Sequence, residues 1–179
     1  MREYPDLIDR ILVQTDLLAK LHPTEPLNWD LPGRIREAED AALTGDRPIA
    51  DAAMLRMVRA CLFYAADALD AAHRIFQDEK SDLGSYGHGM MHRREADFDN
   101  ARYWFRRAGQ QPFFKKLHRE AAECSPLMSR QPSWDPYLFT GECEQARFGA
   151  VEKQAELANL QRAEFDVVLD YCWRGAVQS

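Results

Sequence analysis

The chain has 179 residues, with 29 acidic and 23 basic side chains and a formal net charge of −6. Hydrophobic residues make up 46% and charged residues 29%, a balance typical of folded globular proteins that excludes a globally disordered or low-complexity chain. The longest charge-free apolar run of note, Ala60–Ala66, is far shorter than the ~20 residues of a membrane-spanning helix. The length fits a single domain over residues 1–179.

Charge is unevenly distributed along the chain. Between His88 and Arg119, eight arginine and lysine residues stand against three acidic ones, so a basic middle segment lies within an acidic protein. Such a segment indicates a small anionic ligand or an acidic neighbouring surface. The acidic total argues against a nucleic-acid partner, and we expect no membrane partner. The N-terminal residues lack an apolar signal core and the four cysteines are widely spaced, so we expect a cytoplasmic protein with reduced cysteines.

Hydrophobic periodicity predicts helices along the whole chain and no strand. The span that begins at Pro48 or Ile49 and ends near Asp78 is the longest, about 45 Å at the usual helical rise. We therefore expect an all-α fold, a single irregular helical bundle built on this long central helix. The other expected helices are 4–21, 34–43, 85–95 (helix or turn), 98–108 after an N-cap at Asp97, 112–124, 137–146 and 150–173, with loops at 22–33, 80–85 and 126–136.

The stretch Gly84–Gly109 stands apart in composition. It contains two of the five histidines, five arginines and three glycines within six residues, Gly84, Gly87 and Gly89. Each glycine in a helix costs about 1 kcal/mol relative to alanine, so the glycines need a reason. Either a ligand or a neighbouring backbone approaches closely here, or the segment is a turn that tightens into a helix.

His88, His92 and Glu95 share one face if residues 85–95 are helical. Histidines four residues apart can bind one divalent metal ion, with Glu95 either as a third ligand or as the group that fixes an imidazole tautomer. The same residues fit acid–base catalysis without a metal. They also fit a hydrogen-bonded polar seam between helices, which would be purely structural.

A second polar group follows on the next expected helix. Asn100, Tyr103, Trp104 and Arg107 share a face and combine fixed donors with flat apolar area, as in small-molecule sites. The alternative is an amphipathic seam in which the aromatic rings pack and the arginine pairs with an acid. His73, further upstream, either faces the His88/His92 segment or is a core-edge histidine bonded to a carbonyl group.

The run from Tyr86 to Gly109 resembles the signature of a family of helical proteins without an assigned activity. That signature reads His-x-x-x-His-Arg-Arg-Glu, then an acidic residue, then Asn-x-x-Tyr-Trp-Phe-Arg-Arg-x-Gly, and Asp70-x-x-His73 matches more loosely. Members of the family often carry Trp where this chain has Gly87, so we expect room beside His88. The resemblance implies site positions rather than an activity: His73, His88, His92, Arg93, Arg94, Glu95, Asn100, Tyr103, Trp104 and Arg107.

Three functions remain open from the sequence. The leading hypothesis is a polar pocket for a small anionic metabolite, with His88 or His92 as general acid or base, oriented by Glu95. Arg94 or Arg107 would hold a carboxylate or phosphate, and the remaining residues of the set would line the pocket. The second is a divalent metal site of His88, His92 and either Glu95 or His73. The third is a non-enzymatic structural or interaction module.

Overall fold

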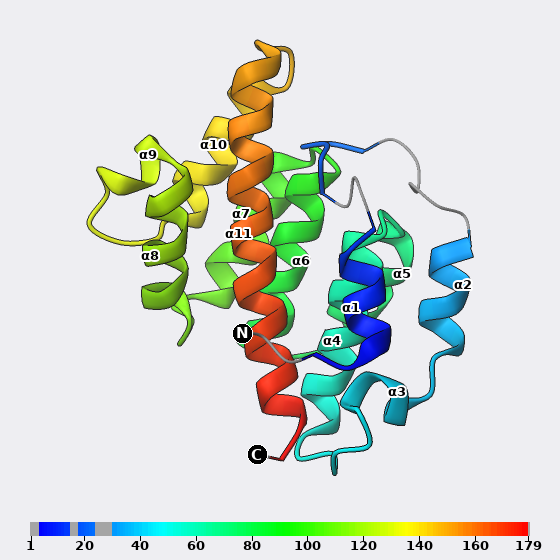
Figure 1. The fold of residues 1–179 in the computed structure, drawn as a ribbon. Coiled ribbons are helices and arrows are strands. Elements are labelled where there is room, and N and C mark those ends of the chain that lie inside the picture. Colours follow the sequence, from blue (N-terminus) through cyan, green and yellow to red (C-terminus); the bar gives the residue numbers. More distant parts are fainter. Residues whose placement is uncertain (1–3, 15–17, 24–29, 179) are drawn as a thin grey trace.

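The structure, a computed structural model, describes residues 4–14, 18–23 and 30–178 (Figure 1). Within those residues it contains eleven helices and no strand, only an isolated bridge between Ile49 and Val177, which confirms the all-α prediction. None of the described helices is both long and apolar enough to span a bilayer. The helices are α1 (Asp6–Leu12), α2 (Asp30–Glu37), α3 (Asp40–Thr44), α4 (Ala52–Ala65), α5 (Leu69–Asp78), α6 (Asp82–Arg94), α7 (Phe98–Ala108), α8 (Phe114–Cys124), α9 (Pro126–Ser129), α10 (Pro136–Ala146) and α11 (Val151–Ala176).

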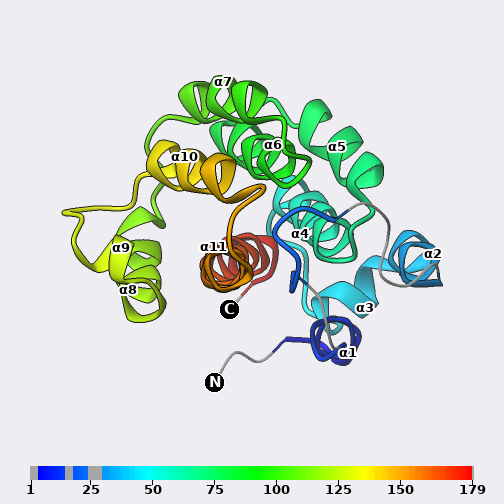
Figure 2. The same cartoon turned by 90° about the horizontal axis from the view of Figure 1, so that it is seen from above.

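The long central helix of the bundle is α11, not the predicted span that ends near Asp78. Helices α4, α8 and α10 all pack against α11, and Figure 2 shows them arranged around it. The predicted long helix is wrong because α4 ends at Ala65 and α5 begins at Leu69. Asp67 lies between them in the left-handed region, with φ of 57°, and the amides of Asp67 and Ala68 close the end of α4 on the carbonyl groups of Tyr64 and Phe63. Helix α5 therefore leaves the direction of α4 and packs beside α6.

Other predicted boundaries also need correction. Of the expected helix 4–21, α1 covers only Asp6–Leu12, while residues 15–17 lie outside the described part and 18–23 are not helical. The expected helix 34–43 is two short helices, α2 and α3. The expected turn at 80–85 already contains the start of α6, because the Ser81 hydroxyl caps that helix by accepting a hydrogen bond from the Gly84 amide at 3.0 Å. The expected loop at 126–136 contains α9, which starts at a proline.

Helix α6 is buried on all sides from Leu83 to Arg94, and its glycines allow the neighbouring helices to pack closely against it. A Cβ atom on Gly87 would lie 2.3 Å from the Phe76 ring of α5, and one on Gly89 would lie 2.7 Å from the Phe105 ring of α7. Neighbouring helices therefore approach α6 more closely than any other residue would allow. Close approach thus explains Gly87 and Gly89, but it is the approach of aromatic side chains and not of the expected ligand or backbone; among the three glycines only Gly84 faces a backbone atom, the Glu79 carbonyl oxygen. The room expected beside His88 is filled by Phe76.

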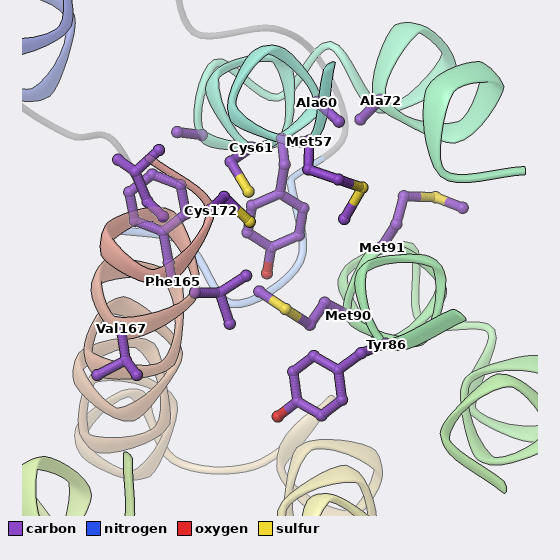
Figure 3. Packing of buried hydrophobic residues seen from close by; sticks show 14 of the residues in the cluster. Met57, Ala60, Cys61, Ala72, Tyr86, Met90, Met91, Phe165, Val167 and Cys172 are labelled. Carbon is purple, nitrogen blue, oxygen red and sulfur yellow. The ribbon is translucent and has the colours of Figure 1, made fainter. Parts of the chain in front are cut away.

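The core between α4, α6 and α11 is rich in sulfur-containing and aromatic side chains. Figure 3 shows Met57 and Cys61 of α4, Met90 of α6, and Phe165 and Cys172 of α11 converging in it. All four cysteines are free; Cys61, Cys143 and Cys172 are buried, and Cys124 is exposed. Three of the four are the small core residues expected from the sequence, whereas Cys124 is not.

Candidate metal centre

Helices α5 and α6 bring His73, His88 and His92 together. One ring nitrogen from each histidine lies within 4.8 Å of the others. The ring centroid of His73 lies 4.6 Å from the ring centroid of His88 and 5.4 Å from that of His92. The ring centroids of His88 and His92 are 4.8 Å apart, and the two ring planes are nearly parallel. The i, i+4 spacing on α6 supplies two imidazoles, and the break before α5 allows the third to reach them.

His88 is the most unusual member of the cluster. Its side chain is buried at 2% exposure, and neither ring nitrogen has a hydrogen-bond partner among the described residues. Burial lowers the pKa of His88 to about 3, with further lowering by His92, His73 and Lys80. The imidazole is therefore neutral at physiological pH, which is the form that binds metal ions. The same low pKa makes His88 a poor match for the predicted general base.

Glu95 lies beside Nδ1 of His92 and is not one of the three residues whose ligand atoms lie together. Its Oε2 lies 3.2 Å from Nδ1 of His92, and Oδ2 of Asp97 lies 3.8 Å from the same atom. The Glu95 contact has ion-pair distance without the alignment of a hydrogen bond. A carboxylate beside Nδ1 favours a proton on that atom and leaves Nε2 as the lone-pair donor. Of the two third ligands considered from the sequence, the structure places His73 in the cluster and Glu95 behind it.

Trp104 of α7 covers the cluster. Its ring stacks on His88 with centroids 3.9 Å apart and planes 18° from parallel. Arg107 lies on Trp104, with Cζ 5.5 Å from the ring centroid, and Tyr103 packs edge-on against it at 5.4 Å. Tyr103 is 48% exposed, so it contributes to the surface rather than to the buried cluster.

Asn100 is not placed with the histidines. Its backbone amide and its Nδ2 each lie 3.3 Å from the Asp97 carboxylate, one on each oxygen. The side chain of Asp97 is the N-cap of α7, so Asn100 belongs to the start of that helix. The predicted ligand-binding role of Asn100 has no support in this arrangement.

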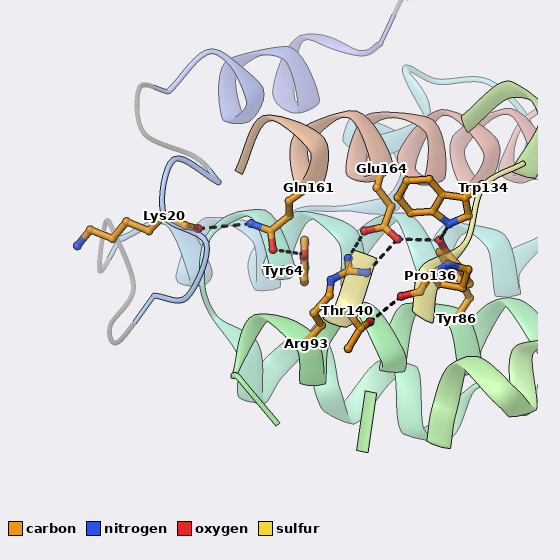
Figure 4. Close-up of polar contacts among 9 residues, drawn as sticks. All are labelled: Lys20, Tyr64, Tyr86, Arg93, Trp134, Pro136, Thr140, Gln161 and Glu164. Carbon is orange, nitrogen blue, oxygen red and sulfur yellow. Dashed lines mark hydrogen bonds and ion pairs between the residues drawn. The ribbon is translucent and has the colours of Figure 1, made fainter. Parts of the chain in front are cut away.

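Arg93 points into the protein, away from the role predicted for it. It forms an ion pair with Glu164 of α11, which also accepts a hydrogen bond from the Tyr86 hydroxyl at 2.7 Å, and Trp134 donates to that hydroxyl at 2.9 Å (Figure 4). The Arg93 guanidinium lies over the ring of Phe139 at 4.1 Å. Arg93 and Glu164 are both fully buried, so this network is structural and inaccessible to a ligand.

Arg94 is likewise held by buried partners. Its Nε donates to Oδ1 of Asp67 at 2.8 Å, its Nη2 contacts the same oxygen, and its Nη1 donates to the Lys20 carbonyl at 2.8 Å. Neither side chain of the Arg94–Asp67 pair is exposed by more than 1%. The pocket-lining role predicted for Arg93 and the anion-holding role predicted for Arg94 therefore have no support in this arrangement, because each arginine already has a buried carboxylate partner.

Two acidic residues that hold these arginines, Asp67 and Glu164, are not predicted from the sequence. Both lie far along the chain from the arginines they pair with, so local spacing gives no sign of the pairs. Glu164 did carry one signal. It sits among the apolar positions of α11, next to Phe165 and one turn after Leu160, where an exposed acid would be out of place.

The sequence and the fold were also compared with known proteins. No family model, no curated protein and no solved structure matches the chain. The inference of function therefore rests on the residues of the cluster and their geometry.

Proposed function

We propose that the protein binds one divalent transition-metal ion through His73, His88 and His92. The observation that carries the proposal is His88, whose two buried ring nitrogens have no partner in the described structure while two further imidazoles lie against it. Buried polar atoms are almost always hydrogen-bonded, and an orphaned one calls for an explanation. A metal ion would satisfy one nitrogen of each histidine at once.

Zinc is the ion that fits these donors best. Three histidines with one open position are a ligand set of catalytic zinc sites, and imidazole suits zinc, copper and nickel better than magnesium or calcium. In tetrahedral coordination at the usual Zn–N distance, the three nitrogens would lie about 3.3 Å from one another. Binding therefore requires the cluster to close by about 1.5 Å from its widest separation. His73 is only partly buried, so rotation of its side chain is the movement that we expect to close the cluster.

The surroundings of the three ligands support the proposal. Glu95 beside Nδ1 of His92 is the carboxylate expected behind a metal-bound imidazole. Trp104 restricts the rotation of His88 and excludes water from one side of it. The metal would lower the pKa of a bound water toward 7, so metal-assisted hydrolysis is the reaction class that such a centre supplies.

Isothermal titration of metal-free protein with Zn²⁺ tests the proposal. We expect one equivalent to bind, and alanine at His88, His92 or His73 to abolish tight binding. His118→Ala is the matched control, because His118 is also a partly buried helical histidine but contacts the Gln131 carbonyl at 2.9 Å. Tight binding that survives the double change His88→Ala, His92→Ala would contradict the proposal, as would absence of binding to the wild-type chain.

A further inference from the structure

A cleft of about 570 Å³ lies at the N-terminal end of α11, the orange end of that helix in Figure 1. Three separate parts of the chain line it: residues 19–23, the two residues that follow α6, and residues between 147 and 155 at the junction of α10 and α11. A cleft of this volume is in the size range of small-molecule sites. The fold therefore encloses, away from the histidine cluster, a space that a small organic molecule could fill.

Two apolar side chains that line this cleft are strongly exposed. Phe148 is 90% exposed and Val151 is 77% exposed. Single exposed apolar residues are common on protein surfaces, but these two line one cleft together with Leu21 and Pro23. A ligand with an apolar part would remove this area from water, which is the main favourable term in most binding reactions.

The charged groups of the cleft favour an anion. Its cations are Arg147 and Lys20, and neither forms an ion pair with a carboxylate within the described residues. Burial lowers the pKa of His22, which also lines the cleft, so this ring is neutral at physiological pH. The one acid among the lining residues is Glu95, whose carboxylate lies 3.2 Å from Nδ1 of His92. The cleft thus carries an excess of positive charge in a protein whose formal net charge is −6.

Arg147 brings the charge and the apolar surface together. Its Cζ lies 5.2 Å from the centroid of the Phe148 ring, so the guanidinium lies over that ring. A guanidinium binds a carboxylate through two parallel hydrogen bonds. A molecule that carries a carboxylate at the end of an apolar chain would therefore contact Arg147 and Phe148 at the same time.

We infer that this cleft binds an amphipathic carboxylate, with the carboxylate on Arg147 and the apolar chain along Phe148 and Val151. Lys20 adds attraction at longer range. The site is distinct from the proposed metal centre, because none of the three clustered histidines lines the cleft. Glu95 is the residue that the two share, since it lines the cleft and lies beside His92.

Isothermal titration of the full chain with octanoate tests the charge of the site. We expect saturable binding of one octanoate, and much weaker binding of acetate, which has the carboxylate without the chain, and of octan-1-ol, which has the chain without the charge. Arg147→Gln should weaken octanoate binding about tenfold, the cost of one charge-assisted contact. Arg106→Gln is the matched control, because Arg106 is also an exposed arginine but does not line the cleft.

A second pair of variants tests the apolar wall. Phe148→Ser should weaken octanoate binding about tenfold, because the chain loses most of its contact area. Val13→Ser is the matched control, since Val13 is 76% exposed, follows α1 and lies outside the cleft. Both side chains are exposed, so neither substitution should disturb folding.

Each outcome decides a separate point. Absence of saturable octanoate binding overturns the inference, and equal effects of Arg147→Gln and Arg106→Gln overturn the role of Arg147. Equal octanoate affinity of metal-free and zinc-loaded protein supports the cleft, whereas binding that only the zinc-loaded protein shows would place the carboxylate on the metal. Sedimentation of the free chain covers the remaining case. Self-association that Phe148→Ser abolishes would show that a second copy occupies this face, and would overturn the small-molecule site.

Discussion

Arg94 at the end of α6 donates from Nε to Oδ1 of Asp67 at 2.8 Å, and Asp67 is the residue at which the chain turns from α4 into α5. This buried pair fixes the C-terminal end of α6 to the joint that directs α5. His92 lies two residues before Arg94, and His73 lies six residues after Asp67. The pair therefore sets how the two histidine-bearing helices approach each other.

Removing Asp67 should destabilise the protein strongly. We expect Asp67→Ala to lower the free energy of unfolding by about 3–5 kcal/mol, because it leaves the Arg94 charge buried and unpaired. Asp67→Asn should cost less, since asparagine tolerates the left-handed backbone and keeps an acceptor for Arg94. Denaturant unfolding measures both variants. The exposed Asp6→Ala, which breaks a surface pair with Arg10, is the control and should change stability by less than about 1 kcal/mol. Equal effects of Asp67→Ala and Asp6→Ala would refute this role of the pair.

Gly87→Ala tests the close approach of α5 to α6. The added methyl group would lie 2.3 Å from the Phe76 ring, so the helices must separate, and we expect a loss of about 1–3 kcal/mol in the free energy of unfolding. Gly141→Ala in α10 is the control, because nothing lies within 4 Å of its added atom, and the higher helix propensity of alanine should stabilise by up to about 1 kcal/mol. Thermal unfolding measures both variants, and we expect Gly87→Ala to lower the melting temperature and Gly141→Ala to raise it. Stabilisation by both substitutions would show that Phe76 does not pack as described.

Glu95 should act through His92. We expect Glu95→Ala to weaken Zn²⁺ binding by about 10–100-fold, the usual effect of removing a carboxylate behind a metal-bound imidazole. Asp99→Ala is the control. Asp99 lies in the same region of the sequence but pairs with Arg102 and contacts no histidine, so its removal should leave the zinc affinity unchanged. Competition titration with a chelator of known affinity separates the two variants. A zinc affinity that Glu95→Ala leaves intact would remove Glu95 from the site.

Asp170 gives the protein a defined sensitivity to acid. Burial alone would raise the pKa of Asp170, but Lys116 at 2.6 Å and Arg174 at 2.9 Å outweigh it and hold the pKa below its ordinary value. A carboxyl group whose pKa is lowered in the folded state stabilises the folded protein at pH values above the unfolded-state pKa of about 4. This stabilisation disappears as the pH falls through the folded-state pKa.

Unfolding of wild-type and Asp170→Asn protein at a series of pH values tests this sign. We expect the wild type to be more stable than Asp170→Asn by about 1 kcal/mol near pH 7. The difference is small because solvent screens both cations, and it should shrink below about pH 4. A difference that grows as the pH falls would contradict the assignment.

The sequence predicts the helical class well but misplaces the joint at Asp67. The apolar pattern continues from α4 into α5, and residues 66–68, Ala-Asp-Ala, contain neither glycine nor proline to mark a break. The turn depends on the Asp67–Arg94 pair, which forms between residues 27 positions apart. A contact of that range leaves no trace in local periodicity.

The candidate site is predictable only in part, because some of its contacts are local in the sequence and others are not. The spacing of His88 and His92 correctly places both imidazoles on one face of α6, because helical geometry is local. The partners of Arg93 and Arg94 are not local, so two buried, neutralised arginines were mistaken for ligand-binding ones. Whether His73 or Glu95 joins the histidines depends on the direction of α5, which is set by tertiary packing.

The most direct test of the metal centre is X-ray absorption at the zinc edge of the zinc-loaded, untagged protein. The account predicts one zinc ion per chain with three imidazole nitrogens at about 2.0 Å and a fourth oxygen or nitrogen ligand, with no sulfur. Loss of the imidazole scattering in the double variant His88→Ala, His92→Ala would complete the assignment. Sulfur scattering at about 2.3 Å, or zinc that washes out of the wild-type protein, would contradict the three-histidine centre.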